Sequence, residues 1–324
     1  MAILIGIDEA GYGPILGPLV VSASVFEVPD DLISRSLWSI LNQSVCKKRL
    51  AAAGRLLIHD SKKLHHRRGD YRLLQRGVLT CLQSADPAQK PPATLASLLD
   101  LLGCRDRDDL DAYPWYGSSL DNWTLKYNPD DIATAAAALS NDMKKNQIRL
   151  LELWAILLPV GKFNQMIEAV NNKASVLFTL TCRHIQRAFQ QFGRAPLQIL
   201  IDKHGARSRY RPHLQRMFPN LQMKILKESD LTSSYQLSAP KRTMKIHFIA
   251  RGDDRQLPVS LASMTSKYLR ELFMEMLNSY FSNLCPDLAP TAGYYKDGRR
   301  FLQDLKKYHL DPRQIPPRLL IRNR

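Results

Sequence analysis

The sequence predicts an α/β protein in which a mixed β-sheet is flanked by helices. Short runs of β-branched and apolar residues have the composition of strands, and longer segments show the spacing of helices. The strands come first along the chain, and helices then alternate with further strands. This order favours a sheet covered by helices, with functional residues at the ends of neighbouring strands.

The amino-terminal part is predicted to form strands followed by a helix. Apolar runs at 3–7 and 19–28 are separated by GYGPILGP, whose glycines and prolines are typical of a loop. The run 55–59 is a candidate for a third short strand, and 65–82 is expected to be a helix. Its helical spacing is carried by Leu73, Leu74, Val78 and Cys81.

The second half of the chain alternates between helix and strand. A helix is predicted at 174–192, followed by the strand LQILID that ends at Asp202. A further strand is expected at 244–250 and a long helix at 259–281. The alternation predicts neighbouring strands whose ends lie at one edge of the sheet.

We expect one domain over residues 1–324, with an inserted helical or irregular segment at about 85–164 and a helical carboxyl-terminal region at about 282–324. The periodic pattern weakens in the inserted segment, which contains AQKPPA, YPWYG and ATAAAAL. Its aromatic residues are suited to stacking on bases, but burial in the core is the better interpretation. A monomer is the default expectation for this chain.

Charge and cysteine usage limit the possible functions. The formal net charge of +16 predicts attraction to a polyanion, with nucleic acid the leading candidate, although charge alone identifies no substrate. Five widely spaced cysteines without a C-x-x-C pair favour reduced thiols in a cytoplasmic protein over a zinc or redox site. The apolar stretch at 150–160 is too short to span a membrane, so no membrane partner is expected.

Three acidic residues at strand ends are candidate metal ligands. Asp8 and Glu9 close an apolar strand, where burial of two carboxylates is costly without cations or strong donors. Adjacent strand residues face opposite sides, so both serve one site only if the strand ends or twists there, which Gly11 and Gly13 permit. A strand that ends in exposed acids is the alternative. Asp202 favours a site for Mg²⁺ or Mn²⁺, because carboxylates at adjacent strand ends converge.

Five segments, in the same order, resemble motifs of the type 2 ribonucleases H, the family of ribonucleases HII and HIII. They are GIDEAGYGPILGPLVVSA, HDSKKL, NNKASVLFTLTCRHIQRAF, LQILIDKHG and GDDRQLPVSLASMTSKYLREL. The chain is similar to a divergent member, because Tyr12 stands where the HII branch usually has arginine. Glu271 stands where that branch has aspartate, which is closer to the HIII pattern.

The resemblance implies a ribonuclease H-like fold and a metal-dependent endonuclease that hydrolyses the RNA strand of RNA/DNA hybrids, or DNA that contains ribonucleotides. Its products would carry 5′-phosphate and 3′-hydroxyl ends, formed with two divalent cations, Mg²⁺ or Mn²⁺. The implied catalytic and metal-binding residues are Asp8, Glu9, Asp202 and Glu271, with Asp8 bridging the cations. The implied substrate-binding residues are Gly11, Tyr12, Gly13, Ser61, Lys62, Lys63, Lys267 and Tyr294.

Several of these assignments have a plainer alternative. Lys267 lies one turn before Glu271 and would equally form an i to i+4 pair on the surface. Lys62 and Lys63 would be solvated surface residues if no motif surrounded them. Tyr295 competes with Tyr294 for the position beside the ribose.

Two other functions remain open. The first is a ribonuclease H-fold nuclease that cuts DNA, which an all-DNA substrate would distinguish. The second is a non-catalytic protein that binds hybrids. Four carboxylate positions argue against the second, because a phosphate-binding surface gains nothing from four negative charges unless metals neutralise them.

Overall fold

The computed structural model describes residues 1–324 except 49–53, 65–69, 105–107, 118–119, 310–314 and 324. A seven-stranded sheet has the strand order β5-β2-β1-β6-β9-β8-β7. Its strands are β1 (Ala2–Ala10), β2 (Leu19–Val28), β5 (Arg149–Leu158), β6 (Leu197–Asp202), β7 (Gln222–Glu228), β8 (Thr232–Ala239) and β9 (Arg242–Ile249). The strands β1, β6 and β9 are parallel, and the other pairs are antiparallel. The predicted class, a mixed sheet flanked by helices, is confirmed.

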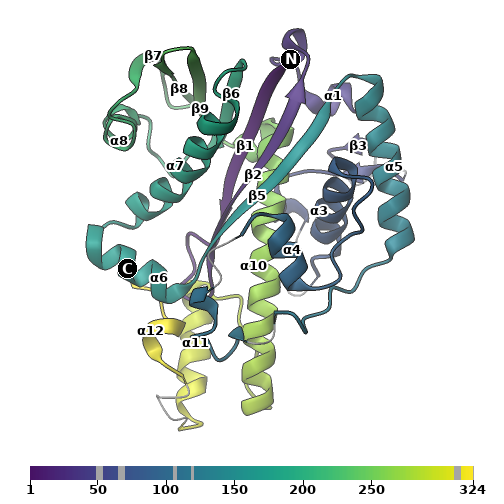
Figure 1. Ribbon diagram of the computed structural model, residues 1–324. Helices are drawn as coiled ribbons and strands as arrows, with labels where there is room; N and C mark the ends of the chain where they lie inside the picture. The colour runs from purple at the N-terminus through teal and green to yellow at the C-terminus, as the bar shows by residue number, and fades with distance from the viewer. Residues whose placement is uncertain (49–53, 65–69, 105–107, 118–119, 310–314, 324) are drawn as a thin grey trace.

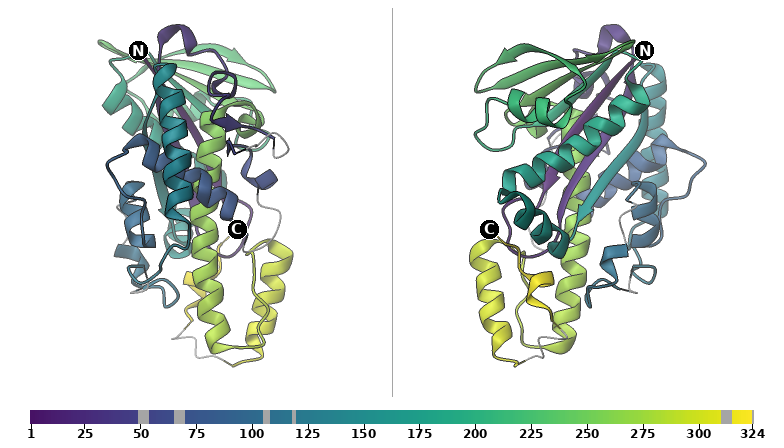
Figure 2. Two further views of the ribbon diagram at one scale, coloured as in Figure 1. Left: turned by 90° about the vertical axis from the view of Figure 1, so that its right-hand side faces the viewer. Right: turned by 60° about the vertical axis from the view of Figure 1, so that its left-hand side comes forward.

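Helices cover both faces of this sheet, as Figures 1 and 2 show. The longer ones are α3 (Arg72–Ala85), α4 (Leu95–Leu101), α5 (Pro129–Lys145), α6 (Val160–Val170), α7 (Lys173–Phe192), α8 (Arg211–Met217), α10 (Leu257–Leu284) and α11 (Tyr295–Lys306). Short elements are α1 (Leu37–Ile40), α2 (Ser61–Leu64), α9 (Gly252–Arg255), α12 (Pro317–Leu320), η1 (Asp30–Leu32), η3 (Asp108–Leu110), β3 (Val45–Cys46) and β4 (Leu56–Leu57).

The strand β1 separates two hydrophobic clusters. Ile3, Ile5 and Ile7 pack with residues of α6 and α7 on one face. Leu4 points to the other face and packs with residues of α3, α5 and α10. Because successive strand residues point to opposite faces, the continuous apolar run of β1 is explained by helices on both sides of it.

The long helix α10 lies directly against β1. A Cβ atom at Gly6 would overlap the backbone of Pro258 and Val259, in the first turn of α10. Glycine therefore permits the helix to approach the strand closely. This contact brings the side chains of α10 to the carboxyl end of β1, where the predicted acidic residues lie.

Six of the predicted elements are confirmed in place. The strands at 3–7 and 19–28 correspond to β1 and β2, the strands ending at Asp202 and near 250 to β6 and β9, and the helices at 174–192 and 259–281 to α7 and α10. The run 55–59 does not join the large sheet, because only Leu56–Leu57 forms a strand and it pairs with β3. Of the helix expected at 65–82, residues 65–69 lie outside the described residues, and α3 begins at Arg72.

The segment 85–164 contains α4, α5 and β5. Its last element, β5, was not predicted as a strand, yet it pairs with β2 along the edge of the large sheet. The aromatic residues Tyr113, Trp115 and Tyr116 are buried, which confirms the core interpretation. Tyr116 packs edge to face on Phe273 of α10, with ring centroids 4.9 Å apart.

The region 282–324 contains the end of α10 together with α11 and α12, which lie beside the lower part of α10 in Figure 1. All five cysteines are free and buried. Among the described helices, none has the length and apolar character needed to cross a membrane.

Candidate active site

Parallel strand register brings acidic residues together at one edge of the sheet. Ile7 of β1 pairs with Ile201 of β6, so Asp8 and Asp202 follow at neighbouring positions. Asp202 pairs with Ile249 at the end of β9, and Asp253 comes four residues later, in α9. Strand ends in this arrangement place carboxyl groups from separate parts of the sequence beside one another.

The carboxyl groups of Asp8, Glu9, Asp202 and Asp253 lie close enough for their charges to interact, and we call them the acidic group. Burial raises the pKa of Asp8 well above its usual value, and Glu9, Asp202 and Asp253 raise it further. The pKa of Glu9 rises to about 7, through burial first and Asp202 second. Burial and then Asp202 also raise the pKa of Asp253 to about 7.

Backbone and hydroxyl donors hold the acidic group in place. The Glu9 amide donates to Asp8 Oδ1 over 2.8 Å, and the Gly252 amide donates to Asp202 Oδ1 over 2.6 Å. From α10, the Ser266 hydroxyl donates to the Asp8 carbonyl oxygen over 3.0 Å. These donors position the carboxyl groups but do not neutralise their combined charge.

Helix α2 places the positively charged Lys62 near the acidic group. Burial by itself lowers the pKa of Lys62, but nearby carboxylates, led by Asp253 and Asp8, outweigh it and raise that pKa. Ser61 is buried, and its hydroxyl lies 3.0 Å from the hydroxyl of Ser263 on α10. The predicted DSKKL segment therefore reaches the acidic group, with Lys62 as its charged contact.

Lys63 points to a different carboxylate. Its Nζ lies 3.0 Å from Asp254 Oδ1, which also lies 2.9 Å from His59 Nε2 and 3.1 Å from Lys47 Nζ. Hydrogen bonds from Lys63, Lys47 and His59 hold the pKa of Asp254 below its usual value. Lys63 is thus ion-paired with Asp254 at a half-exposed position.

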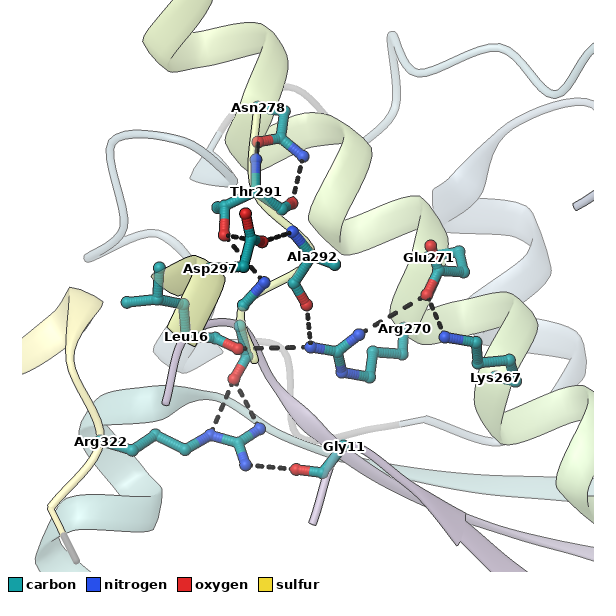
Figure 3. A network of polar contacts seen from close by, with 12 residues as sticks. Gly11, Leu16, Lys267, Arg270, Glu271, Asn278, Thr291, Ala292, Asp297 and Arg322 are labelled. Atoms are coloured by element: carbon teal, nitrogen blue, oxygen red, sulfur yellow. Dashed lines mark hydrogen bonds and ion pairs between the residues drawn. The ribbon is translucent and has the colours of Figure 1, made fainter. Parts of the chain in front are cut away.

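Glu271 is paired with cations on its own helix. Lys267 Nζ lies 2.5 Å from Glu271 Oε1, and Arg270 Nη1 lies 3.5 Å from the same oxygen (Figure 3). The i to i+4 pair expected as an alternative is present, but it is buried and not at the surface. The carboxylates that raise the pKa values of Asp8 and Glu9 come from strand ends and from α9, and Glu271 is ion-paired with Lys267 and Arg270.

The acidic group fits a divalent cation by chemistry but is not closed around one. Buried carboxylate oxygens that repel one another are the hard ligands that Mg²⁺ and Mn²⁺ prefer. Within the part of the chain that the structure describes, no three acidic, histidine or cysteine side chains are arranged to hold an ion.

The glycine loop, residues 11–17, leaves β1 beside the acidic group. Gly11 has a φ of 91°, and a Cβ atom there would lie 2.6 Å from the Pro18 carbonyl oxygen and 2.7 Å from Arg270 Nε. Gly13 is exposed, and a Cβ atom at this position would meet nothing within 4 Å. Gly11 is therefore required by backbone conformation and space, whereas Gly13 is accessible from solvent.

Tyr294 lies beside the glycine loop. The Gly293 carbonyl oxygen accepts from the amides of Ile15 and Leu16, over 2.8 and 3.2 Å. Tyr294 itself is 49% exposed, and the Arg270 guanidinium lies 5.6 Å from its ring centroid. The structure therefore brings together two predicted substrate-binding parts that are almost 280 residues apart in the sequence.

Tyr12 has cationic neighbours that were not predicted. Lys173 Nζ, at the start of α7, lies 4.9 Å from the Tyr12 ring centroid. Burial and Glu9 raise the pKa of Tyr12, while the positive charge of Arg207 lowers it. The prediction also missed Asp253, although it belongs to the segment GDDRQLPVSLASMTSKYLREL, which resembles a family motif. Its place just after the last parallel strand was the signal that could have found it.

His204 is not suited to proton transfer near neutral pH. Burial, together with the charge of Arg207, lowers its pKa to about 3. Its Nε2 lies 3.3 Å from the hydroxyl of Thr181, and its amide donates to the hydroxyl of Tyr210. A neutral, packed imidazole is the consistent interpretation.

No family model matches the chain, and no curated protein matches it by sequence. Among solved structures, it is similar to ribonuclease HII in a PCNA complex from Archaeoglobus fulgidus (14% identity, TM-score 0.42, 99% of this chain and 94% of that chain). It is also similar to a mutant of Bst-RNase HIII (15% identity, TM-score 0.45, 98% of this chain and 65% of that chain). A third similar structure is ribonuclease H2 from Pyrococcus horikoshii OT3 (14% identity, TM-score 0.40, 97% of this chain and 92% of that chain). At these values, the site's own residues must carry the functional assignment.

Proposed function

We propose that this protein is a metal-dependent endonuclease that hydrolyses the RNA strand of RNA/DNA hybrids, or DNA that contains ribonucleotides. One observation carries the proposal: a buried group of mutually repelling carboxyl groups lies at adjacent strand ends beside a glycine loop. Such repulsion is costly unless cations neutralise it. In phosphodiester cleavage, divalent cations held by carboxylates stabilise the attacking and leaving oxygens.

Asp8, Glu9 and Asp202 are the proposed metal ligands, with Asp253 as a fourth carboxylate at the same group. Divalent cations bound there would activate water and stabilise the leaving oxygen. Glu271, whose Oε1 is paired with Lys267, is a further proposed ligand through its other carboxylate oxygen. In the absence of a cation, Glu9 and Asp253 keep raised pKa values and hold protons near neutral pH.

Selection of RNA requires contact with the 2′-hydroxyl, which distinguishes the two sugars. The exposed Gly13 allows close approach of a sugar, and the half-exposed ring of Tyr294 lies next to the same loop. Lys62 and Lys173 border this region and would contact phosphates as positive charges. The net charge of +16 would add affinity that falls with salt.

Cleavage of three labelled duplexes tests the proposal: DNA with one ribonucleotide, DNA with four ribonucleotides, and all-DNA. Each is incubated with purified protein and Mg²⁺ or Mn²⁺, and EDTA is the control. We expect cutting of the ribonucleotide-containing strands alone, abolished by EDTA. Cutting of all three duplexes would indicate a DNA nuclease, and binding without cutting would indicate a hybrid-binding protein.

A further inference from the structure

Two buried arginines, Arg270 and Arg322, form a second charged region in contact with the glycine loop (Figure 3). Arg322, which follows α12, donates from Nε and Nη2 to the Gly17 carbonyl oxygen over 2.8 and 2.6 Å. Its Nη1 donates to the carbonyl oxygen of Gly11 and, over 3.5 Å, to that of Pro14. One guanidinium therefore contacts both ends and the middle of the loop.

The main chain beside Arg322 adds further contacts with the same loop. The Arg322 amide donates to the Ile15 carbonyl oxygen over 2.9 Å, and Ile321 forms an antiparallel bridge with Leu16. The guanidinium also lies 4.8 Å from the ring centroid of Phe163. These contacts join a segment near residue 322 to a loop near residue 14.

Arg322 is deeply buried without an acidic partner among the described residues. It is 4% exposed, and burial together with the charge of Arg270 lowers its pKa to about 9. Burial of a charge is costly unless hydrogen bonds compensate it. For Arg322 the compensation comes from carbonyl oxygens of the glycine loop, so that its position depends on the shape of the loop and the loop's shape depends on it.

The direction of the Gly11 carbonyl determines the direction of the next amide. In a trans peptide, the carbonyl oxygen and the following N–H point to opposite sides. Arg322 holds the Gly11 carbonyl oxygen toward the buried guanidinium. The amide of Tyr12 is therefore directed away from Arg322.

Arg270 connects this loop to Tyr294. Its Nη2 donates to the carbonyl oxygens of Leu16, over 3.4 Å, and Ala292, over 2.9 Å. The guanidinium lies 5.6 Å from the Tyr294 ring centroid. Arg322 supports the loop from the opposite end of the same network, which Figure 3 shows as a continuous set of contacts.

We propose that Arg322 is a positioning residue for ribonucleotide recognition: its guanidinium holds the glycine loop so that the Tyr12 amide and the Tyr294 ring are correctly placed for the sugar. The inference rests on the proposed function, because it assigns ribose recognition to this loop. Among the described residues, Arg322 makes its polar contacts with the glycine loop and not with the acidic group, so it acts through the loop.

Two variants, Arg322→Lys and Arg322→Gln, test the role. Lysine keeps a positive charge but lacks the planar set of donors that contacts three carbonyl groups. Arg187→Gln is the control, because Arg187 is an arginine on α7 that binds Glu152 and lies over the Trp154 ring, with no contact to the glycine loop among those described. Hydrogen–deuterium exchange of residues 11–17, melting temperature, kcat and KM are measured for each protein.

We expect faster exchange of residues 11–17 in both Arg322 variants and a fall in kcat/KM for the one-ribonucleotide duplex of roughly tenfold or more in Arg322→Gln. Arg322→Lys should recover part of this loss, and the Mn²⁺ concentration for half-maximal rate should not change. Arg187→Gln should lower the melting temperature without changing exchange in the loop. If Arg322→Gln does not fold, Arg322→Lys and the exchange measurement still decide the question.

Unchanged exchange of residues 11–17 in an active protein would overturn the role of Arg322 alone. The role of Arg322 would also be overturned if the fall in kcat/KM of Arg322→Gln, relative to its fall in melting temperature, were no larger than in the control Arg187→Gln. A wild-type protein that cleaves no ribonucleotide-containing duplex would instead overturn the proposed function and the recognition role with it. Exchange in the loop would then still report whether Arg322 holds it.

Discussion

The acidic group and the Arg322 region are both buried and charged, but their charges are compensated differently. The carboxyl groups of Asp8, Glu9 and Asp253 face one another and have raised pKa values. Arg322 faces backbone carbonyl oxygens that accept its hydrogen bonds. The acidic group therefore remains electrostatically strained, whereas the Arg322 guanidinium is satisfied by hydrogen bonds within the protein.

This difference separates the two regions by role. A group whose charges repel one another gains from a cation supplied by solvent, which is expected of a reaction centre. A cation already satisfied by the backbone gains nothing from a ligand and instead determines the shape of a loop. Substitutions in the first region should change activity more than folding, and substitutions in the second should change both.

The largest effect is expected for Asp8→Asn. It removes a charge at the centre of the acidic group, so cleavage of ribonucleotide-containing duplexes should fall by roughly a thousandfold or more. Because asparagine resembles the protonated carboxyl that burial favours, the melting temperature in EDTA at pH 8 should rise, not fall. Cleavage rate and thermal unfolding are the two measurements.

Binding of the hybrid by Asp8→Asn, measured in EDTA, should stay within a few-fold of the wild-type value. Full activity in this variant would exclude the acidic group as the reaction centre. A fall in melting temperature, in contrast, would show that its carboxyl groups stabilise the fold.

A second comparison uses two glycines of the same loop. Gly11→Ala must place a Cβ atom against Arg270 and Pro18 at a φ of 91°, so it should reduce the free energy of unfolding by about 1–3 kcal/mol and also reduce cleavage. Gly13→Ala has open space and should change the free energy of unfolding by less than about 0.5 kcal/mol. Denaturant unfolding measures both.

Equal destabilisation by Gly11→Ala and Gly13→Ala would show that Arg270 and Pro18 do not restrict the space at Gly11. Loss of cleavage in Gly13→Ala without loss of stability would instead identify Gly13 as a point of substrate contact.

The smallest effects, of opposite sign, are expected for the neighbours Asp253 and Asp254. The folded-state pKa of Asp253 is raised to about 7 from 3.8, so stability is lost as pH rises through this window, and Asp253→Asn should be more stable at pH 8 in EDTA by about 1 kcal/mol. The pKa of Asp254 is lowered, so its contribution is present above pH 3.8 and is lost as pH falls. Asp254→Asn should therefore be less stable at pH 8, by about 1 kcal/mol or less because the side chain is 32% exposed.

Thermal unfolding at pH 8 and pH 4 measures both variants. The Asp253→Asn difference should shrink at pH 4, whereas the Asp254→Asn difference should remain, because the contribution of Asp254 is lost only below pH 3.8. If both variants changed stability in the same direction at pH 8, the contrast between an unpaired and a paired carboxylate at these neighbouring positions would be wrong.

Local pattern was sufficient for much of the fold. The apolar run before Asp8 and the LQILID strand before Asp202 predicted β1 and β6, because strand residues buried on both faces are continuously apolar. The spacing of 174–192 and 259–281 predicted α7 and α10. The same reasoning missed β5, whose apolar run contains Glu152 and lies in a segment of weak pattern.

The sequence by itself determined which residue types end the strands: Asp8, Glu9 and Asp202 follow apolar runs, and this alone predicts a costly carboxylate site. Only the tertiary structure decided which carboxylates meet. Strand register placed Asp253 near Asp202, and α10 brought Lys267 against Glu271. The tertiary structure likewise placed Arg322 against the glycine loop, about 300 residues earlier in the sequence. Contacts between distant segments depend on packing and leave no periodic signal in either segment.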